Sequence, residues 1–235
     1  ALANFRYGLA EGNGYVVLVG AVGTGKTTLV NALLAALDER VIVASLNHPT
    51  LAGDEFLAFI ARTYDPTATI SSKADCLHFF KDFLQRSHAN GKSVLLVIDE
   101  AHRLSAELLE EVRLLSNMEQ YGRKLINIFF VGQTELLHKL RSPACRALRQ
   151  RITLFYHLRP LAQVDTEKYI VHRLKVAGTE ARLFTPQALQ TIHALTRGYP
   201  RVINKLCDRA LLTGFVKEKK TIDAAIIQEC AREIS

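Results

Sequence analysis

Residues 20–28 of this chain read Gly20-Ala21-Val22-Gly23-Thr24-Gly25-Lys26-Thr27-Thr28, and they match the phosphate-binding pattern G-x-x-x-x-G-K-[ST] in full. The segment follows an apolar, β-rich run, Tyr15–Val19, and precedes a helical pattern, Leu29–Leu37. A strand, a glycine-rich turn and a helix in this order form the context in which the pattern binds phosphate. The sequence therefore predicts a phosphate loop between the first strand and the first helix of an α/β domain.

The residue types in this segment suit an anion. Glycines let successive backbone N–H groups turn inward, and the positive end of the following helix adds to their field. We expect the Lys26 ammonium to reach the terminal phosphates and the Thr27 hydroxyl to hold Mg²⁺. The residues predicted to bind the nucleotide are Gly20, Gly23, Thr24, Gly25, Lys26, Thr27 and Thr28.

The length of 235 residues suits one large domain, or one domain with a smaller appendage. No apolar run approaches the ~20 residues that span a bilayer, and no secretory signal is recognisable. Because the first residue is Ala1, we expect a fragment of a longer protein, from which a membrane anchor could have been cut. The four cysteines show no C-x-x-C spacing, which argues against zinc and favours a reducing compartment. The formal net charge of +7 is compatible with an acidic partner without identifying one.

Strand-like segments alternate with helix-length segments up to about Leu158. The predicted strands are Tyr15–Val19, Arg40–Ser45, Ser93–Asp99, Leu125–Val131 and Ile152–Leu158. Three of them are nearly continuous in Val, Ile, Leu and Phe, which is typical of strands covered by helices on both faces of a parallel sheet. One intervening helix is predicted over Ala106–Met118, with Ser105 as its N-cap. We therefore predict an α/β fold of the P-loop NTPase kind, a doubly wound nucleotide-binding domain over residues 1–159.

The pattern changes after Pro160, where no strong strand follows. The predicted helices are Asp165–Val176, a helix starting at Pro186 after the cap residue Thr185, Val202–Phe215 and Asp223–Ile234. Residues 160–235 are therefore predicted to form a smaller, all-helical lid domain. Arg201, in the run Gly198-Tyr199-Pro200-Arg201 at the head of a lid helix, could fold back and sense the phosphates; solvation of the helix start is the alternative.

The third predicted strand ends in two acids, Asp99 and Glu100. Ligands of open α/β sheets bind at the carboxyl ends of the strands, where the phosphate loop also lies. Asp99 is predicted to orient Mg²⁺ and its waters, and Glu100 to polarise an attacking water. Two adjacent acids at the end of a buried strand also require a neutralising cation, which is consistent with this interpretation.

The end of the fourth strand adds a polar candidate, Gln133. If the third and fourth strands are neighbours, Gln133 lies beside Glu100 and can hydrogen-bond the water or the γ-phosphate; an ordinary loop glutamine fits the sequence nearly as well. Asn127 is a weaker candidate because it lies early in that strand. Residues 99–102, Asp-Glu-Ala-His, also spell the box of certain helicases, but the chain is too short for two tandem motor domains. His102 is therefore interpreted as a polar residue in a turn.

Residues 141–159 contain five arginines and no acid. A solvated basic face, a nucleic-acid patch and an arginine finger directed at a neighbouring subunit's γ-phosphate all fit this composition. Arg151, directly before the fifth strand, is the best placed for a finger, and Arg149 and Arg146 are the alternatives.

Together these parts resemble an AAA+ ATPase: a phosphate loop, an Asp-Glu strand, a polar residue after the fourth strand, an arginine before the fifth, and Gly-x-x-Arg in a helical lid. The finer pattern is similar to the bacterial general secretion pathway component A family, the ExeA/GspA type, from about residue 5 to the end. The segments that carry it include Gly23–Thr28, Asp99–His102, Leu114–Asn117, Val131–Gln133, Gln150–Thr153, Tyr156–Leu161 and Gly198–Asn204.

The resemblance implies an oligomeric ATPase that uses ATP and Mg²⁺ in the cytoplasm, often as the cytoplasmic part of an inner-membrane protein. The implied role is assembly or remodelling of a type II secretion-like export machine. Its implied partners are other copies of itself through the nucleotide site and a membrane-associated secretion component, with peptidoglycan bound only by parts outside this chain.

The residues also bear on three other functions. A DNA-associated AAA+ ATPase that helps a transposase select targets is the main alternative, because such proteins look similar and are also basic. A GTPase is disfavoured, since the nearest match to its N-K-x-D guanine reader, Asn204-Lys205-Leu206-Cys207, lacks the aspartate. A metabolic kinase would need neither the Arg201 sensor nor an arginine finger.

Overall fold

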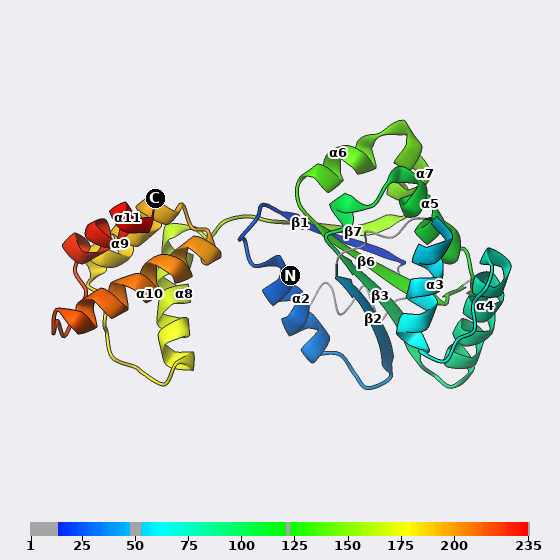
Figure 1. Cartoon of the computed structure of the whole chain (residues 1–235), viewed down its shortest axis with the longest axis horizontal. Coiled ribbons are helices and arrows are strands. Elements are labelled where there is room, and N and C mark those ends of the chain that lie inside the picture. Colours follow the sequence, from blue (N-terminus) through cyan, green and yellow to red (C-terminus); the bar gives the residue numbers. More distant parts are fainter. Residues whose placement is uncertain (1–13, 48–52, 121–122, 235) are drawn as a thin grey trace. The chain divides into compact units, whose positions relative to one another are not determined.

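The structure, a computed structural model, describes residues 14–47, 53–120 and 123–234, which group into two compact units (Figure 1). The first unit holds the described residues up to Ala21 together with Lys26–Leu158. The second holds Val22–Gly25 and the described residues from Arg159 onward. Residues 5–13, where the resemblance to the GspA type begins, lie outside the described residues.

The first unit is built on a parallel sheet of five described strands in the order β2-β3-β6-β1-β7. These strands are β1 (Tyr15–Gly20), β2 (Val41–Asn47), β3 (Ser93–Asp99), β6 (Ile126–Gly132) and β7 (Ile152–Leu158). The predicted parallel α/β sheet is confirmed, and two of the predicted strands, Ser93–Asp99 and Ile152–Leu158, have the observed bounds. The order brings β1, β3 and β6, three strands far apart in the sequence, into the middle of the sheet.

Helices cover both faces of this sheet (Figure 1). They are α2 (Lys26–Ala35), α3 (Gly53–Tyr64), α4 (Lys73–Ala89), the 3₁₀ helix η1 (Ala101–Arg103), α5 (Ala106–Leu115), α6 (Glu135–Arg141), the 3₁₀ helix η2 (Pro143–Cys145) and α7 (Arg146–Arg149). Successive strand residues point to opposite faces. Tyr15, Val17 and Val19 accordingly pack in one core with residues of α3 to α7, while Val16 and Leu18 pack with α2 on the other face.

Local sequence accounts for the ends of the helices near the carboxyl edge of the sheet. The Ser105 hydroxyl accepts a hydrogen bond from the Leu108 backbone N–H at 3.2 Å, so Ser105 is the N-cap of α5 as predicted. The helix ends at Leu115, three residues before the predicted Met118, and a short antiparallel pair follows, β4 (Glu119–Gln120) and β5 (Arg123–Lys124). Strands of two residues carry no periodic signal, so the sequence did not indicate this pair.

The second unit contains four described helices around a core of its own. They are α8 (Gln163–Val176), α9 (Pro186–Thr196), α10 (Pro200–Val216) and α11 (Ala224–Ile234). The Thr185 hydroxyl caps α9, with Pro186 in the first turn, as predicted. An isolated parallel bridge between Phe184 and Ile222 joins two loops of the unit, a pairing that the helical prediction did not include.

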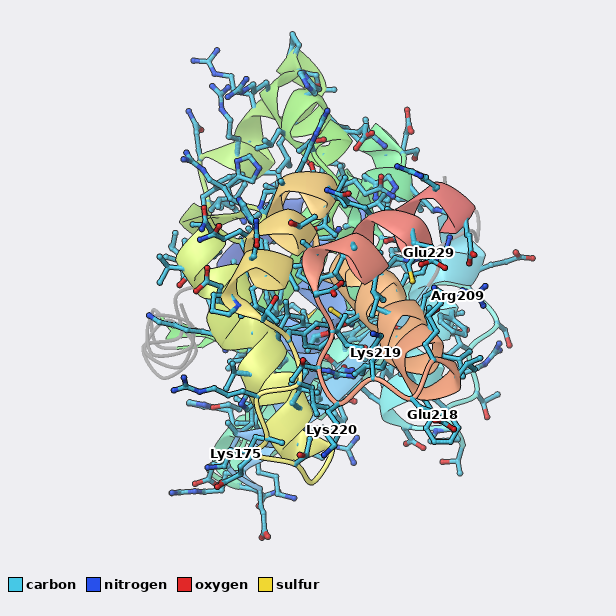
Figure 2. All side chains as sticks on the ribbon, turned by 90° about the vertical axis from the view of Figure 1, so that its left-hand side faces the viewer. Lys175, Arg209, Glu218, Lys219, Lys220 and Glu229 are labelled. Carbon is cyan, nitrogen blue, oxygen red and sulfur yellow. The ribbon has the colours of Figure 1, made fainter. Side chains whose placement is uncertain are left out.

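Charged side chains of α8, α10, α11 and the turn after α10 lie on the surface of the second unit, and Figure 2 labels six of them. Ion pairs join α10 and its following residue to α11: Arg209 Nε lies 2.9 Å from Glu233, and Lys217 Nζ lies 2.6 Å from Glu229. These groups are about half exposed, so each pair contributes at most about 1 kcal/mol to stability.

Tyr15 joins the first strand to helix α5 inside the first core. The ring is fully buried and stacks on Phe130 with a centroid distance of 5.9 Å. Its hydroxyl donates to Ser116 Oγ at 2.5 Å and lies 3.4 Å from the carbonyl oxygen of Val112. Burial raises the pKa of Tyr15 from 10.0 to about 12, and the Ser116 hydrogen bond acts in the opposite direction.

This shift predicts an alkaline loss of stability. The unfolded chain loses the phenol proton near pH 10 and the folded chain only near pH 12, so the contribution is complete below pH 10 and is lost between those values. Over that range the free energy of unfolding of the wild type should fall by about 2 kcal/mol more than that of Tyr15→Phe. Urea titrations at a series of pH values measure both slopes, and equal slopes would contradict the assignment.

Candidate nucleotide-binding site

The phosphate loop has a backbone that its glycines permit. Gly23 and Gly25 have φ angles of +80° and +93°, a region that residues with a Cβ rarely adopt. A Cβ built on Gly25 would meet nothing within 4 Å, so the backbone conformation, rather than a lack of space, requires glycine there. Helix α2 begins directly afterwards at Lys26, which places its positive end at the loop. Thr27 and Thr28 lie in the exposed first turn of this helix.

Lys26 supplies the buried cation of this region, with 7% of its surface exposed. Its Nζ donates to the carbonyl oxygen of Gly20 at 2.9 Å and to that of Ala21 at 3.1 Å. Burial lowers the pKa of Lys26, while the nearby carboxylates of Glu100 and Asp99 raise it. The ammonium is therefore fixed at the carboxyl end of β1, within electrostatic reach of the two acids at the end of β3.

Asp99 brings strand β3 next to the start of α2. Its Oδ2 accepts a hydrogen bond from the Thr27 hydroxyl at 3.3 Å, and its Oδ1 accepts one from the Glu100 backbone N–H at 2.8 Å. The two predicted Mg²⁺ ligands, 72 residues apart in the sequence, are thus in direct contact. Hydroxyl and carboxylate oxygens are the hard ligands that Mg²⁺ prefers.

The donor set fits a metal that phosphates help to bind. No group of three or more His, Cys, Asp or Glu side chains that could hold a metal ion occurs in the part of the chain that the structure describes. In nucleotide sites Mg²⁺ keeps several waters and takes only one or two protein oxygens together with substrate phosphates. Thr27 Oγ1 and Asp99 Oδ2 meet that requirement without a complete protein cage.

Glu100 has an unusual backbone for a residue with a side chain. Its φ of 54° and ψ of 31° are left-handed, a conformation that costs roughly 1–2 kcal/mol outside glycine. Strain of this kind persists where the surroundings impose it, and it is concentrated at functional sites. The carboxylate Oε2 lies 3.5 Å from Gln133 Nε2 and 3.6 Å from His102 Nε2. The half-exposed Arg103 lies at 3.8 Å from the same oxygen.

Gln133 reaches Glu100 because β3 and β6 are adjacent in the sheet, with Ile98 paired to Phe130. It follows β6 directly, so its side chain emerges at the same edge as the acids. Asn127, the other candidate in this strand, lies near the opposite end, where its Oδ1 accepts a hydrogen bond from the Gly14 backbone N–H at 3.3 Å. The structure therefore brings Gln133 to the acidic pair and leaves Asn127 away from it.

Arg151 lies at the other end of the sheet from the phosphate loop of its own chain. It precedes β7, whose first residue Ile152 pairs with Tyr15, whereas Gly20 at the loop pairs with Leu158. A strand of this length spans roughly 20 Å. The Arg151 guanidinium donates to Asn117 Oδ1, and the alternatives Arg146 and Arg149 lie exposed on α7. Within one chain, therefore, Arg151 does not meet the acids or Lys26.

Arg201 lies in the second unit, in the first turn of α10 after Pro200, with an exposed side chain. The predicted helical pattern around it is present, with Tyr199 as the extended residue before the helix. Its role in sensing phosphates stays a prediction from the Gly-x-x-Arg pattern.

Comparison with known proteins identifies the family. Residues 9–140 match the family described as AAA domain. The chain belongs to this family. General secretion pathway protein A of Aeromonas hydrophila is 41% identical over 239 residues, which cover 100% of this chain and 43% of that protein. The chain is therefore an AAA+ ATPase domain of the GspA type, as the sequence resemblance indicated.

More distant relatives share part of this AAA+ domain. The Holliday junction branch migration complex subunit RuvB of Synechocystis is 32% identical over 150 residues, which cover 57% of this chain and 39% of that protein. The chain thus spans less than half the length of the Aeromonas protein, and its matched part covers 39% of the RuvB protein.

A solved structure with the same architecture supports the fold alone. The Aeropyrum pernix ORC2 protein, in ADPNP and ADP complexes, superposes with a TM-score of 0.72 at 17% identity, covering 99% of this AAA+ chain and 65% of that chain. The predicted P-loop α/β fold with a helical C-terminal region is confirmed. Of the helices in the described residues, none combines the length and the apolar character needed to cross a membrane.

The structure also brings in residues that sequence reasoning missed. His102, which was interpreted as a turn residue, lies between Glu100 and Gln133 with 14% of its side chain exposed. Lys139 of α6 donates to the carbonyl oxygens of His102 and Leu104. The only sequence signal for this cluster was the position of His102 two residues after Glu100, because every other contact depends on tertiary structure.

The left-handed conformation of Glu100 predicts an unusual stability order. Both Glu100→Ala and Glu100→Gly remove the carboxylate, but only glycine relieves the backbone. Glu100→Gly should therefore be the more stable variant by about 1 kcal/mol. At an ordinary site the order is reversed, so an alanine variant that unfolds at the same or a higher urea concentration would contradict the conformation.

Proposed function

We propose that this chain is the motor of an oligomeric AAA+ ATPase that hydrolyses ATP with Mg²⁺ and drives the assembly or remodelling of a membrane-associated secretion machine. The observation that carries the ATPase part is the convergence of Lys26, Asp99, Glu100 and Gln133 at one edge of the sheet. The secretion part is supported by the 41% identity to General secretion pathway protein A across the whole chain.

ATP would be held by the phosphate loop and Lys26. The residues proposed to contact it are Gly20, Gly23, Thr24, Gly25, Lys26, Thr27 and Thr28. The Lys26 ammonium, now bonded to two carbonyl oxygens, has the charge and the position to bind the terminal phosphates. Thr27 and Asp99 would hold Mg²⁺, which when bound withdraws charge from the phosphate oxygens.

Glu100 is the proposed base for the attacking water. Its carboxylate lies beside the Gln133 amide, so the two side chains can hold one water between an acceptor and a donor. Both acids are close enough to Lys26 to raise the pKa of its ammonium, so the cation and the two acids belong to one site. Gln133 is therefore proposed to orient the water or the γ-phosphate.

Arginines of a neighbouring copy and of the helical unit are proposed to complete the site. Because Arg151 lies at the far end of the sheet from its own phosphate loop, a catalytic role requires a neighbouring copy, which implies self-association through the nucleotide site. Arg146 and Arg149, both exposed on α7, are the alternative fingers. Arg201 is proposed to sense the phosphates from the helical unit, residues 160–235.

A DNA-associated ATPase that helps a transposase select targets is the alternative. The observation in its favour is the similarity to RuvB, which is named as a Holliday junction branch migration subunit, together with the net charge of +7. Binding to plain duplex DNA over a series of salt concentrations separates this alternative from the secretion role, since phosphate contacts give a steep dependence on salt.

Lys26→Ala tests the nucleotide site. Removal of the buried ammonium should weaken ATP binding by about 2–5 kcal/mol, because the phosphates lose their charged partner. Titration calorimetry measures the affinity, and Lys81→Ala, on the exposed face of α4, is the matched control. Wild-type affinity in a folded Lys26→Ala chain would refute the site.

Mixing two inactive variants tests the shared site. Glu100→Gln should bind ATP and turn over slowly, and Arg151→Ala should lose roughly 10³–10⁵ of turnover while it still binds ATP. In a mixture, some interfaces join a Glu100 from one variant to an Arg151 from the other, so phosphate release should partly recover.

The same mixing with Arg149→Ala and Arg146→Ala identifies which arginine acts. If phosphate release recovers with one of these variants and not with Arg151→Ala, the arginine finger is a residue of α7 and not Arg151. The absence of recovery in all three mixtures would show that each site is complete within one chain.

A further inference from the structure

The carboxylate of Glu100 has a second neighbour besides Gln133, namely the ring of His102. The Nε2 atom of His102 lies 3.6 Å from Glu100 Oε2, and 14% of the histidine side chain is exposed. The ring is therefore shielded from bulk water and faces the proposed base. The Arg103 guanidinium is half exposed at 3.8 Å from the same oxygen, where water screens its effect on the carboxylate.

The opposite nitrogen of the same ring contacts the end of strand β6. The backbone N–H of Gln133 donates to His102 Nδ1 at 3.4 Å. An acceptor nitrogen carries no proton, so in the neutral ring the proton lies on Nε2. The Nε2–H group is then the donor that faces Glu100. One imidazole thus accepts from the residue that follows β6 and presents its N–H to the proposed base.

The backbone around His102 is fixed by two further contacts. Lys139 Nζ donates to the His102 carbonyl oxygen at 2.7 Å and also to that of Leu104, which ties η1 to α6. Gly132, the last residue of β6, passes so close that a Cβ would lie 3.2 Å from the His102 backbone nitrogen and 3.1 Å from Leu136 Cδ2. The end of β6 and the turn that bears His102 are therefore packed backbone to backbone.

We propose that His102 is a positioning residue that couples the end of β6 to the carboxylate of Glu100. Its Nε2–H orients the carboxylate. Its Nδ1 accepts from the Gln133 backbone N–H, so the position of the ring depends on the position of that backbone. A displacement of Gln133 is thereby transmitted to Glu100 through the ring, in addition to the direct contact of the Gln133 amide at 3.5 Å. This inference rests on the proposed function, in which Glu100 is the base.

Two substitutions separate the functions of the two ring nitrogens. The amide oxygen of His102→Asn can replace Nδ1 as the acceptor for the Gln133 N–H, but no donor remains for Glu100. The amide nitrogen of His102→Gln can replace Nε2 as the donor to Glu100, but the Gln133 N–H loses its acceptor. His78→Gln and His78→Asn, on the exposed face of α4, are the matched controls.

The proposal predicts that the two His102 variants rank in opposite orders: His102→Gln has the higher kcat, and His102→Asn has the higher melting temperature. His102→Asn should lower kcat about tenfold or more with KM and ATP affinity close to wild type, the size expected when a residue that orients another is lost. His102→Gln should recover most of that kcat and yet melt at a lower temperature than His102→Asn. If both measurements rank the two variants in the same order, or if kcat is unchanged in both, His102 does not position Glu100.

A spectroscopic measurement tests the ring independently of turnover. In ¹⁵N-labelled chain at a pH where the ring is neutral, the signals that disappear in His102→Asn belong to His102. They should show the tautomer with the proton on Nε2, whether or not the chain hydrolyses ATP. The tautomer with the proton on Nδ1 would overturn the proposal, whereas a wild-type chain with no turnover and the expected tautomer would count only against the proposed ATPase function.

Discussion

The adjacency of β1, β3 and β6 in one parallel sheet is the constraint on which the rest of the site depends. Parallel strands present their carboxyl ends at one edge, so three segments that are far apart in the sequence deliver their polar side chains to one place. β1 leads into the phosphate loop and Lys26, β3 into Asp99 and Glu100, and β6 into Gln133. β6, which leads into Gln133, lies between the other two, so the end of β1 and the end of β3 flank it on either side.

This arrangement is held at a cost in stability. An ammonium is buried, an acid with a left-handed backbone follows a buried strand, and a glycine permits two backbones to approach closely. The apolar cores on both faces of the sheet supply the stabilisation that offsets these features. Strain at Glu100 and close packing at Gly132 indicate a site whose backbone is fixed before any ligand binds, which is what electrostatic stabilisation of a transition state requires.

The fold could be predicted from the sequence because its signals are local. Apolar runs, the glycine-rich turn and the cap at Ser105 each lie within a few residues, and they indicated the strands, the loop and the start of α5. The contact of Thr27 with Asp99 could also be predicted, because ligand-binding residues of a parallel sheet gather at the carboxyl ends of its strands. The β4–β5 pair was not, since two-residue strands leave no pattern.

Contacts that depend on side-chain packing were beyond sequence reasoning. His102 could be placed in a turn, but its position between Glu100 and Gln133 follows from the register of β3 against β6 and from Lys139, 37 residues away. The link between Arg151 and Asn117 likewise joins a strand start to a loop 34 residues earlier. The roles of the site residues, and the boundary at residues 159–160 as a functional boundary, stay predictions.

A crystal structure of the chain with Mg²⁺ and a non-hydrolysable ATP analogue tests the central claim most directly. The account predicts that the terminal phosphates contact the Lys26 ammonium, that the metal lies between those phosphates and Thr27 on the side of Asp99, and that the Glu100 carboxylate faces the γ-phosphate. Phosphates bound away from Lys26, or Asp99 and Glu100 turned away from the nucleotide, would contradict it.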